Sequence, residues 1–241
     1  METYIIDADN IDRDLFFYNL TRNNNDFSML PVFELDRITQ KIRNILKKHG
    51  SRKDIILKHN EIKEAFFSPF KPQLKNAQVF LSHSHADKNK ALKVKDYLES
   101  KTKRKVFIDS LFWDYKDDVL NELAEYDDIS KIEDAFTLIL RESLQDVIEK
   151  CPYFVFLQSK NSVSNQGLSR HQDLLKITYS AWIYEELKIA HSISAISESH
   201  LIPMMESMQV FHNISLFLKS FETITLNELS QQINSRNKHV F

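Results

Sequence analysis

The sequence predicts an α/β protein in which helices cover both faces of a parallel sheet. From about residue 77 onward, short apolar segments alternate with longer segments of helical periodicity. The short segments are apolar throughout, which is typical of strands that are buried on both faces. The chain of 241 residues has only two glycines, Gly50 and Gly167, so an all-β fold with many tight hairpins is not expected.

The first 74 residues predict a mainly helical extension that precedes the sheet domain at 75–241. The segment ELDRITQKIRNILKKHG places three isoleucines at helical spacing before Gly50, which is a predicted C-terminal cap. A second helix is expected over 54–67. The following segment SPFKPQLKN contains two prolines and is expected to form the linker between the two parts.

The sheet domain is expected to contain five strands and several helices. Strands are predicted at 77–82, 105–109, 153–158, 201–205 and 222–226, and helices at 88–101, 131–150, 179–193 and 226–234. In such sheets ligands bind at the carboxyl ends of the strands, near the point where the strand order reverses. The residues just after the first three strands are therefore the first candidates for a site.

The composition indicates which cellular compartment and which kinds of partner are expected for this protein. The hydrophobic content of 42%, charged content of 27% and net charge of −2 are typical of a soluble globular protein, and a nucleic-acid partner is not expected. The single cysteine, Cys151, excludes a disulfide within the chain and favours a reducing compartment. No window approaches 20 apolar residues, and METYIIDADNID is not a secretory signal. A cytoplasmic protein without a membrane partner is expected.

The stretch VFLSHSHADK raises the question of a metal site, because His83, His85 and Asp87 have the spacing of a metallohydrolase motif. That motif continues with a histidine, but Lys88 stands at this position. No histidine lies between His85 and His171 to complete a ligand set. A metal is therefore not expected, and solvated loop histidines are the simple alternative. The acidic residues between 114 and 128 lack the spacing of a calcium loop.

The helix that begins near Ser180 contains two adjacent glutamates with different predicted environments. At 100° per residue, Glu185 falls on a polar stripe, whereas Glu186 falls beside an apolar stripe and one turn after Trp182. Burial of an acid is costly unless it is paired or functional. Glu186 is therefore either a member of an ordinary salt bridge at the rim of the stripe or a functional residue.

Four segments in this order resemble a Toll/interleukin-1 receptor (TIR) domain of the bacterial type: VFLSHSHADK, KVFIDS, YFVFLQSKNSVS and SAWIYEEL. Ser82, His83 and Asp87 match the pattern after the first strand of that family, and Asp109 matches the end of its second strand. Trp182 and Glu186 match the Trp-x-x-x-Glu pattern of the enzymatic members. The resemblance covers about residues 77–226, and residues 1–74 lie outside it.

The resemblance implies a flavodoxin-like sheet of five strands. In the enzymatic members it also implies cleavage of the bond between nicotinamide and ribose in NAD⁺, with Glu186 as the catalytic carboxylate. NAD⁺ would be the substrate, and neither a metal nor a further cofactor would be needed. The resemblance suggests a substrate-binding set around Glu186, comprising Ser82, His83, Ser84, Phe112, Trp113 and Trp182. For Phe112 and Trp113, closure of a loop over the core is an equal alternative to stacking on a base.

The same resemblance suggests that the protein either depletes NAD⁺ or makes a signal derived from ADP-ribose in antiviral defence, with a downstream effector that responds to the product. Self-assembly through TIR domains is a further implied property. However, the segment SLFWDYKDDV after the second strand has neither the Gly nor the Pro that often occurs there. Two alternatives stay open: a non-catalytic interaction module, and an enzyme related to nucleoside hydrolases or deoxyribosyltransferases.

Overall fold

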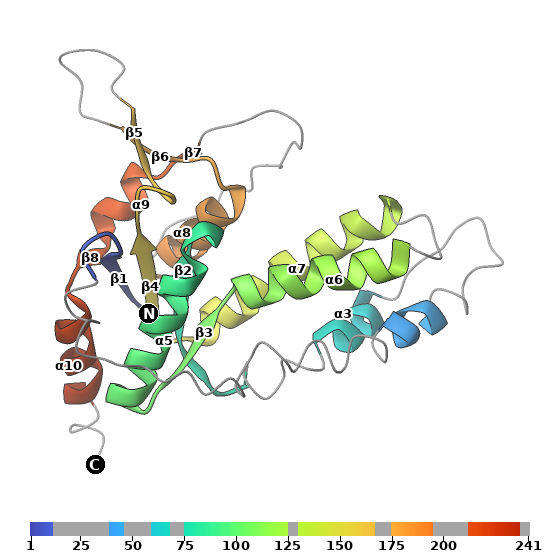
Figure 1. Ribbon diagram of the computed structural model, residues 1–241, viewed down its shortest axis with the longest axis horizontal. Helices are drawn as coiled ribbons and strands as arrows, with labels where there is room; N and C mark the ends of the chain where they lie inside the picture. Colours follow the sequence, from blue (N-terminus) through green and yellow to red (C-terminus); the bar gives the residue numbers. More distant parts are fainter. Residues whose placement is uncertain are drawn as a thin grey trace. The chain divides into compact units, whose positions relative to one another are not determined.

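The computed structural model describes residues 1–11, 39–45, 59–67, 75–124, 130–166, 175–194 and 212–236 (Figure 1). The chain divides into two compact units. One unit takes its described residues from 1–20, 77–108 and 145–241, and it holds the parallel sheet. The other takes them from 21–76 and 109–144, and its described residues are mainly helical. None of the described helices combines the length and apolar character needed to cross a membrane.

Five parallel strands form the central sheet, in the order β3-β2-β4-β1-β8. The strands are β1 (Glu2–Asp7), β2 (Ala77–His83), β3 (Lys105–Ile108), β4 (Tyr153–Gln158) and β8 (Glu222–Thr223). The predicted α/β class with an all-parallel sheet is therefore confirmed. The predicted strands at 77–82, 105–109 and 153–158 agree with β2, β3 and β4 to within one residue.

The middle of the sheet is held by aromatic side chains on neighbouring strands. The ring of Phe80 on β2 stacks on Phe154 of β4 at a centroid distance of 5.6 Å, and it lies 5.7 Å from the ring of Phe107 on β3. These three residues are direct partners in the strand register. Burial of each such side chain contributes roughly 1.5–3 kcal/mol, and cross-strand aromatic contacts add to this.

The N-terminal strand corrects the prediction for the first part of the chain. Glu2–Asp7 was expected to belong to a mainly helical extension, but this segment is β1 and it lies between β4 and β8. Its four central residues are buried, including Tyr4, Ile5 and Ile6. The apolar run at residues 4–6 is short and acidic residues flank it, so the sequence pattern did not mark this segment as a strand. Pairing on both sides supplies the stability that this short segment does not have alone.

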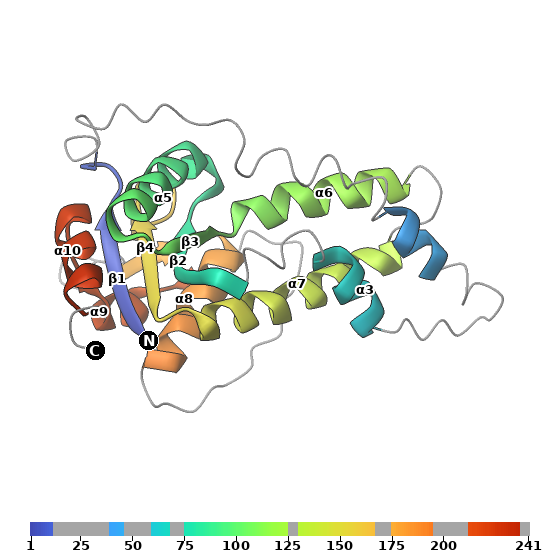
Figure 2. The same cartoon turned by 90° about the horizontal axis from the view of Figure 1, so that it is seen from below.

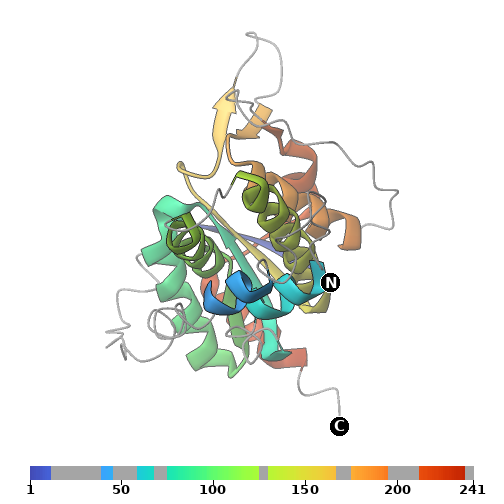
Figure 3. The ribbon, with the colours of Figure 1, turned by 90° about the vertical axis from the view of Figure 1, so that its right-hand side faces the viewer.

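Helices lie on both faces of the sheet (Figures 2 and 3). Helix α5 (Lys88–Thr102) covers one face and contacts β2, β3 and the C-terminal helix α10 (Leu226–Arg236). Helix α8 (Ala181–Ser194) covers the opposite face and packs against β1 and β2. The helices predicted at 88–101, 179–193 and 226–234 are confirmed, with ends that differ by at most two residues.

The C-terminal part of the sheet unit differs from the expectation in two ways. The strand predicted at 201–205 lies outside the described residues, and the one predicted at 222–226 is the short edge strand β8. A second sheet of three antiparallel strands was not predicted, because its segments are short and mostly polar. It consists of β5 (Ser164–Gln166), β6 (Leu175–Thr178) and β7 (His212–Asn213), and the short helix α9 (Ser215–Ser220) follows β7.

The second unit has its own apolar core. It contains α3 (His59–Phe67), α6 (Ser110–Ala124) and most of α7 (Ser130–Lys150). The ring of Phe66 meets Phe136 edge to face at 5.1 Å, and both side chains are fully buried. The predicted helix at 131–150 is confirmed. The segment SLFWDYKDDV was expected to be a loop, but it is the beginning of α6.

Candidate functional site

The strand order reverses between β2 and β4, and the loops after these two strands meet there. From β2 the chain continues to β3 on one side, and the next strand of the sheet, β4, lies on the other side of β2. In parallel sheets the carboxyl ends of strands at such a point form the usual ligand site. Asp87, in the short helix η1 (His85–Asp87) after β2, is joined to the loop after β4 by two hydrogen bonds.

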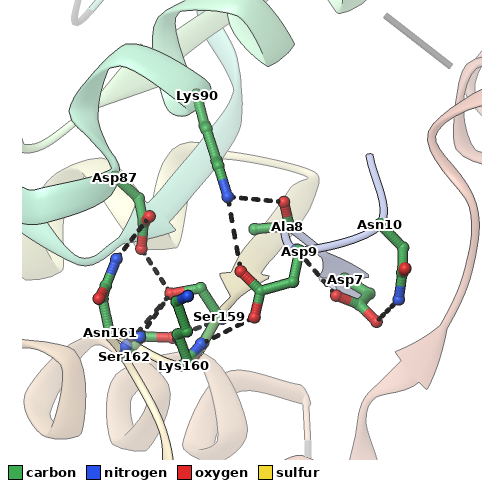
Figure 4. A network of polar contacts seen from close by, with 10 residues as sticks. All are labelled: Asp7, Ala8, Asp9, Asn10, Asp87, Lys90, Ser159, Lys160, Asn161 and Ser162. Carbon is green, nitrogen blue, oxygen red and sulfur yellow. Dashed lines mark hydrogen bonds and ion pairs between the residues drawn. The ribbon is translucent and has the colours of Figure 1, made fainter. Parts of the chain in front are cut away.

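The carboxylate of Asp87 is the centre of this contact (Figure 4). The hydroxyl of Ser159 donates a hydrogen bond of 2.5 Å to Oδ2 of Asp87, and the side-chain amide of Asn161 donates one of 2.9 Å to Oδ1. Asp87 and Ser159 are both buried. Asp87 precedes α5, as predicted, but its side chain does not cap the helix. Its role in joining two loops was missed, because the partners lie more than seventy residues away.

A second group of contacts joins the end of β4 to the end of β1 (Figure 4). The backbone N–H of Lys160 donates to Oδ2 of Asp9 at 3.1 Å. The ammonium of Lys90 on α5 donates to the carbonyl oxygen of Ala8 at 3.1 Å and lies 3.5 Å from Oδ1 of Asp9. The carboxyl ends of β2, β4 and β1 are thus connected in one continuous polar edge.

Helix α8 brings Glu186 to this edge from the other face of the sheet. Ser180 caps the helix as predicted, because its Oγ accepts a hydrogen bond of 3.2 Å from the backbone N–H of Ile183. Ser82, next to last in β2, donates its hydroxyl to Oε2 of Glu186 at 2.5 Å. Both side chains are 0% exposed. The structure therefore brings together two of the residues that the sequence predicted for one site.

Glu185 does not lie on an exposed face, and the expectation of a wet polar stripe is wrong at this residue. It is 3% exposed, and its Oε1 lies 3.9 Å from the ammonium of Lys188. Helix α8 packs not only against β1 and β2 but also against the antiparallel strand β6 and helix α9. More than one side of the helix is therefore buried, whereas the periodicity had assumed a single apolar stripe. Burial raises the pKa of the neighbouring Tyr184 phenol above 10.0, and the charge of Glu185 raises it further.

The remaining predicted residues near β2 have different environments. His83 is the last residue of β2 and is 3% exposed, whereas Ser84, directly after it, is half-buried. His85 is exposed, so the two histidines of the His-x-His motif do not share one environment. Trp182 is half-buried on α8, one turn before Glu186. No group of three His, Cys, Asp or Glu side chains suited to a metal occurs in the described part of the chain.

Phe112 and Trp113 lie in α6, in the helical unit, and not in a loop after β3. Their side chains lie outside the described residues, so their assignment to the substrate site stays a prediction. Cys151 is buried between α7 and β4, and burial raises its pKa to about 12. A thiol with this pKa remains protonated at neutral pH, which agrees with the interpretation of Cys151 as a small apolar residue.

Comparison of the chain with protein-family models, with curated proteins and with solved structures finds no match. The TIR resemblance therefore depends on the four quoted segments alone.

Proposed function

We propose that the protein cleaves the bond between nicotinamide and ribose in NAD⁺, with Glu186 as the catalytic carboxylate. The observation that carries this proposal is the hydrogen bond between Ser82 and Glu186 at the carboxyl end of β2, next to the point where the strand order reverses. A buried carboxylate at this position is costly to the fold, which favours a functional role over an incidental one.

The chemistry needs few groups. Nicotinamide leaves NAD⁺ as a neutral molecule from a cationic precursor, so no general acid is required. The ribose carbon then carries positive charge, and one carboxylate beside the sugar stabilises it. Water or an internal nucleophile completes the reaction, and the product is ADP-ribose or a signal derived from it. A role in antiviral defence, with an effector that responds to the product, belongs to the same proposal.

In the described conformation the carboxylate of Glu186 is not accessible to a substrate, so the proposed reaction requires the site to open. Glu186 is 0% exposed, and its Oε2 is already occupied by the hydroxyl of Ser82. NAD⁺ reaches the carboxylate only after neighbouring side chains move. In this proposal the described conformation is the resting state, and a trigger or self-assembly opens the site. In the resting state the hydroxyl of Ser82 holds the carboxylate of Glu186 by a hydrogen bond. When the site opens, this hydroxyl instead donates its hydrogen bond to water or to the substrate.

The hydrogen bond that satisfies Glu186 is the observation that a second candidate, a non-catalytic interaction module, would also explain. In that case the hydrogen bond to Ser82 only satisfies a carboxylate that fixes α8 on the sheet. The two candidates differ in one property, because only the enzyme releases nicotinamide.

The test is the incubation of concentrated protein with NAD⁺, with and without a crowding agent, and the measurement of nicotinamide by chromatography. We expect Glu186→Gln to lower the rate at least about a hundredfold. Glu185→Gln is the matched control, because it removes the adjacent carboxylate of the same helix, and its rate should stay within about threefold of wild type. Equal rates for wild type and Glu186→Gln would overturn the site assignment, and no release under any condition would favour the interaction module.

A further inference from the structure

We propose that the carboxyl edge of the sheet binds an extended dinucleotide, whose adenosine half occupies a pocket at the ends of β1 and β8 and whose pyrophosphate lies near Lys160. This inference rests on the proposed function in one respect: NAD⁺ is the dinucleotide whose other half would lie at Ser82 and Glu186. The pocket itself is defined by residues other than Ser82 and Glu186.

The pocket has an apolar floor and a polar rim. Its volume is about 210 Å³, which is below the roughly 300 Å³ that a complete drug-sized ligand needs. It therefore suits one part of a larger molecule. The buried floor consists of Ile6, Ile11 and Leu226. The exposed residues of the rim are Asp7, Asn10, Thr223, Thr225 and Glu228. A flat base on the floor and a sugar at the rim would match this division.

Glu228 supplies the acceptor that a ribose requires. Its Oε2 accepts hydrogen bonds from the backbone N–H and the hydroxyl of Thr225, at 3.0 and 2.7 Å. Its Oε1 accepts none from the described residues. The two bonds from Thr225 lower the pKa of Glu228, so the carboxylate is charged at neutral pH. Glu228 lies in the first turn of α10, just beyond the end of β8, and its carboxylate is placed at the rim of the pocket, where it could accept hydrogen bonds from ribose hydroxyls.

The strand register places the pocket level with the proposed catalytic residues. Leu157 of β4 pairs with His83 of β2 on one side and with Ile6 of β1 on the other. The floor of the pocket therefore begins at the same height in the sheet as the end of β2. Two strand spacings separate β2 from β1, which is about 10 Å. A ligand that joins the two places must be extended along the edge, as a dinucleotide is.

Lys160 lies between these two places. It follows β4, which is the strand between β2 and β1, and its backbone N–H is fixed by Asp9. The residue is exposed, and within the described residues its ammonium forms no ion pair. Lys90, by contrast, already contacts Ala8 and Asp9. Lys160 is thus a cation at this edge that is available for a pyrophosphate.

Calorimetry with adenosine and with ADP as separate probes tests the two parts of the proposal. Glu228→Gln keeps the pattern of a capping box, so the helix start is retained, and it should weaken adenosine binding about tenfold. Lys160→Gln should weaken ADP about threefold and leave adenosine unchanged. Glu149→Gln and Lys219→Gln are controls at exposed positions away from the pocket, and both probes should bind them as they bind wild type.

Failure of adenosine and ADP to bind wild type at millimolar concentration would overturn the proposal, and so would unchanged adenosine binding by Glu228→Gln. Adenosine binding that Glu228→Gln weakens, found together with no nicotinamide release, would support the pocket and contradict the proposed reaction. Equal losses of ADP and adenosine in Lys160→Gln would contradict the assignment of the pyrophosphate.

Discussion

The hydroxyl of Ser82 donates a 2.5 Å hydrogen bond to the carboxylate of Glu186, which lies 104 positions later in the chain. This bond joins the carboxyl end of β2 to the helix that covers β1 and β2. Both side chains are removed from solvent, so loss of this hydrogen bond would not be replaced directly by water. The consequences can be measured independently of any activity.

The losses of stability on removing Ser82 and Glu186 should not be additive, because the two side chains share one hydrogen bond. Ser82→Ala leaves a buried carboxylate with one fewer donor, and we expect the free energy of unfolding to fall by about 1–3 kcal/mol. In a cycle with Glu186→Ala, the double variant should lose less than the sum of the single variants. Urea unfolding followed by circular dichroism measures all four proteins. Strict additivity would show that the two side chains do not interact in solution.

The strand β1 should be essential to the sheet unit, although it lies at the N-terminus. Ile5 is 5% exposed and pairs with Phe156 on one side and Thr223 on the other. Ile5→Ala should lower the free energy of unfolding by about 2–4 kcal/mol, because it leaves a cavity in the core. The exposed residue Lys219 provides the control, and Lys219→Ala should change stability by less than about 0.5 kcal/mol. A wild-type melting temperature for Ile5→Ala would mean that β1 does not pair in solution.

Cys151 should be unreactive in the folded protein. Burial raises the pKa of its thiol from 9.0 to about 12, and only the thiolate reacts with a disulfide reagent. At pH 8 the folded protein should react far more slowly than the protein in guanidinium chloride. The raised pKa also makes stability depend on pH, because the folded state favours the neutral thiol over the thiolate. The contribution of the buried thiol to stability is fully present below pH 9 and is lost as the pH rises toward 12. Fast labelling of the folded protein would contradict the burial.

Glu228 should titrate below its ordinary range because Thr225 donates to it. The backbone N–H of Thr225 makes the larger contribution to the lowered pKa, and its hydroxyl makes the smaller one. A lowered pKa stabilises the fold above pH 4.5, and this contribution is lost as the pH falls through the folded-state pKa. Thr225→Ala should raise the pKa part of the way toward 4.5, whereas Thr225→Ser should not. Titration of the Glu228 carboxyl by NMR distinguishes the two variants.

Much of the sheet unit was predictable from local sequence patterns. A few segments and residues show where such patterns no longer predict the structure. The segment YFVFLQ is apolar without interruption and became a central strand at the predicted residues. The segment ETYIID has a shorter apolar run between acids, and only its two neighbouring strands make it a strand. Helical periodicity placed Glu186 correctly beside the buried face, but it placed Glu185 wrongly, because it considers one partner surface and α8 has several.

The sequence by itself determined the fold class, the positions of β2, β3, β4 and, less sharply, β8, the helices α5, α8 and α10, and the place of Glu186 beside the apolar stripe of its helix. These features depend on local propensity and on the spacing of apolar side chains, which are properties of short segments. Only the tertiary structure decided that β1 enters the sheet beside β4, that Ser82 meets Glu186 and that Asp87 joins Ser159 and Asn161. Each of these depends on contacts between residues far apart in the chain. Such contacts leave no local pattern, because either partner alone is an ordinary polar residue or a short apolar run.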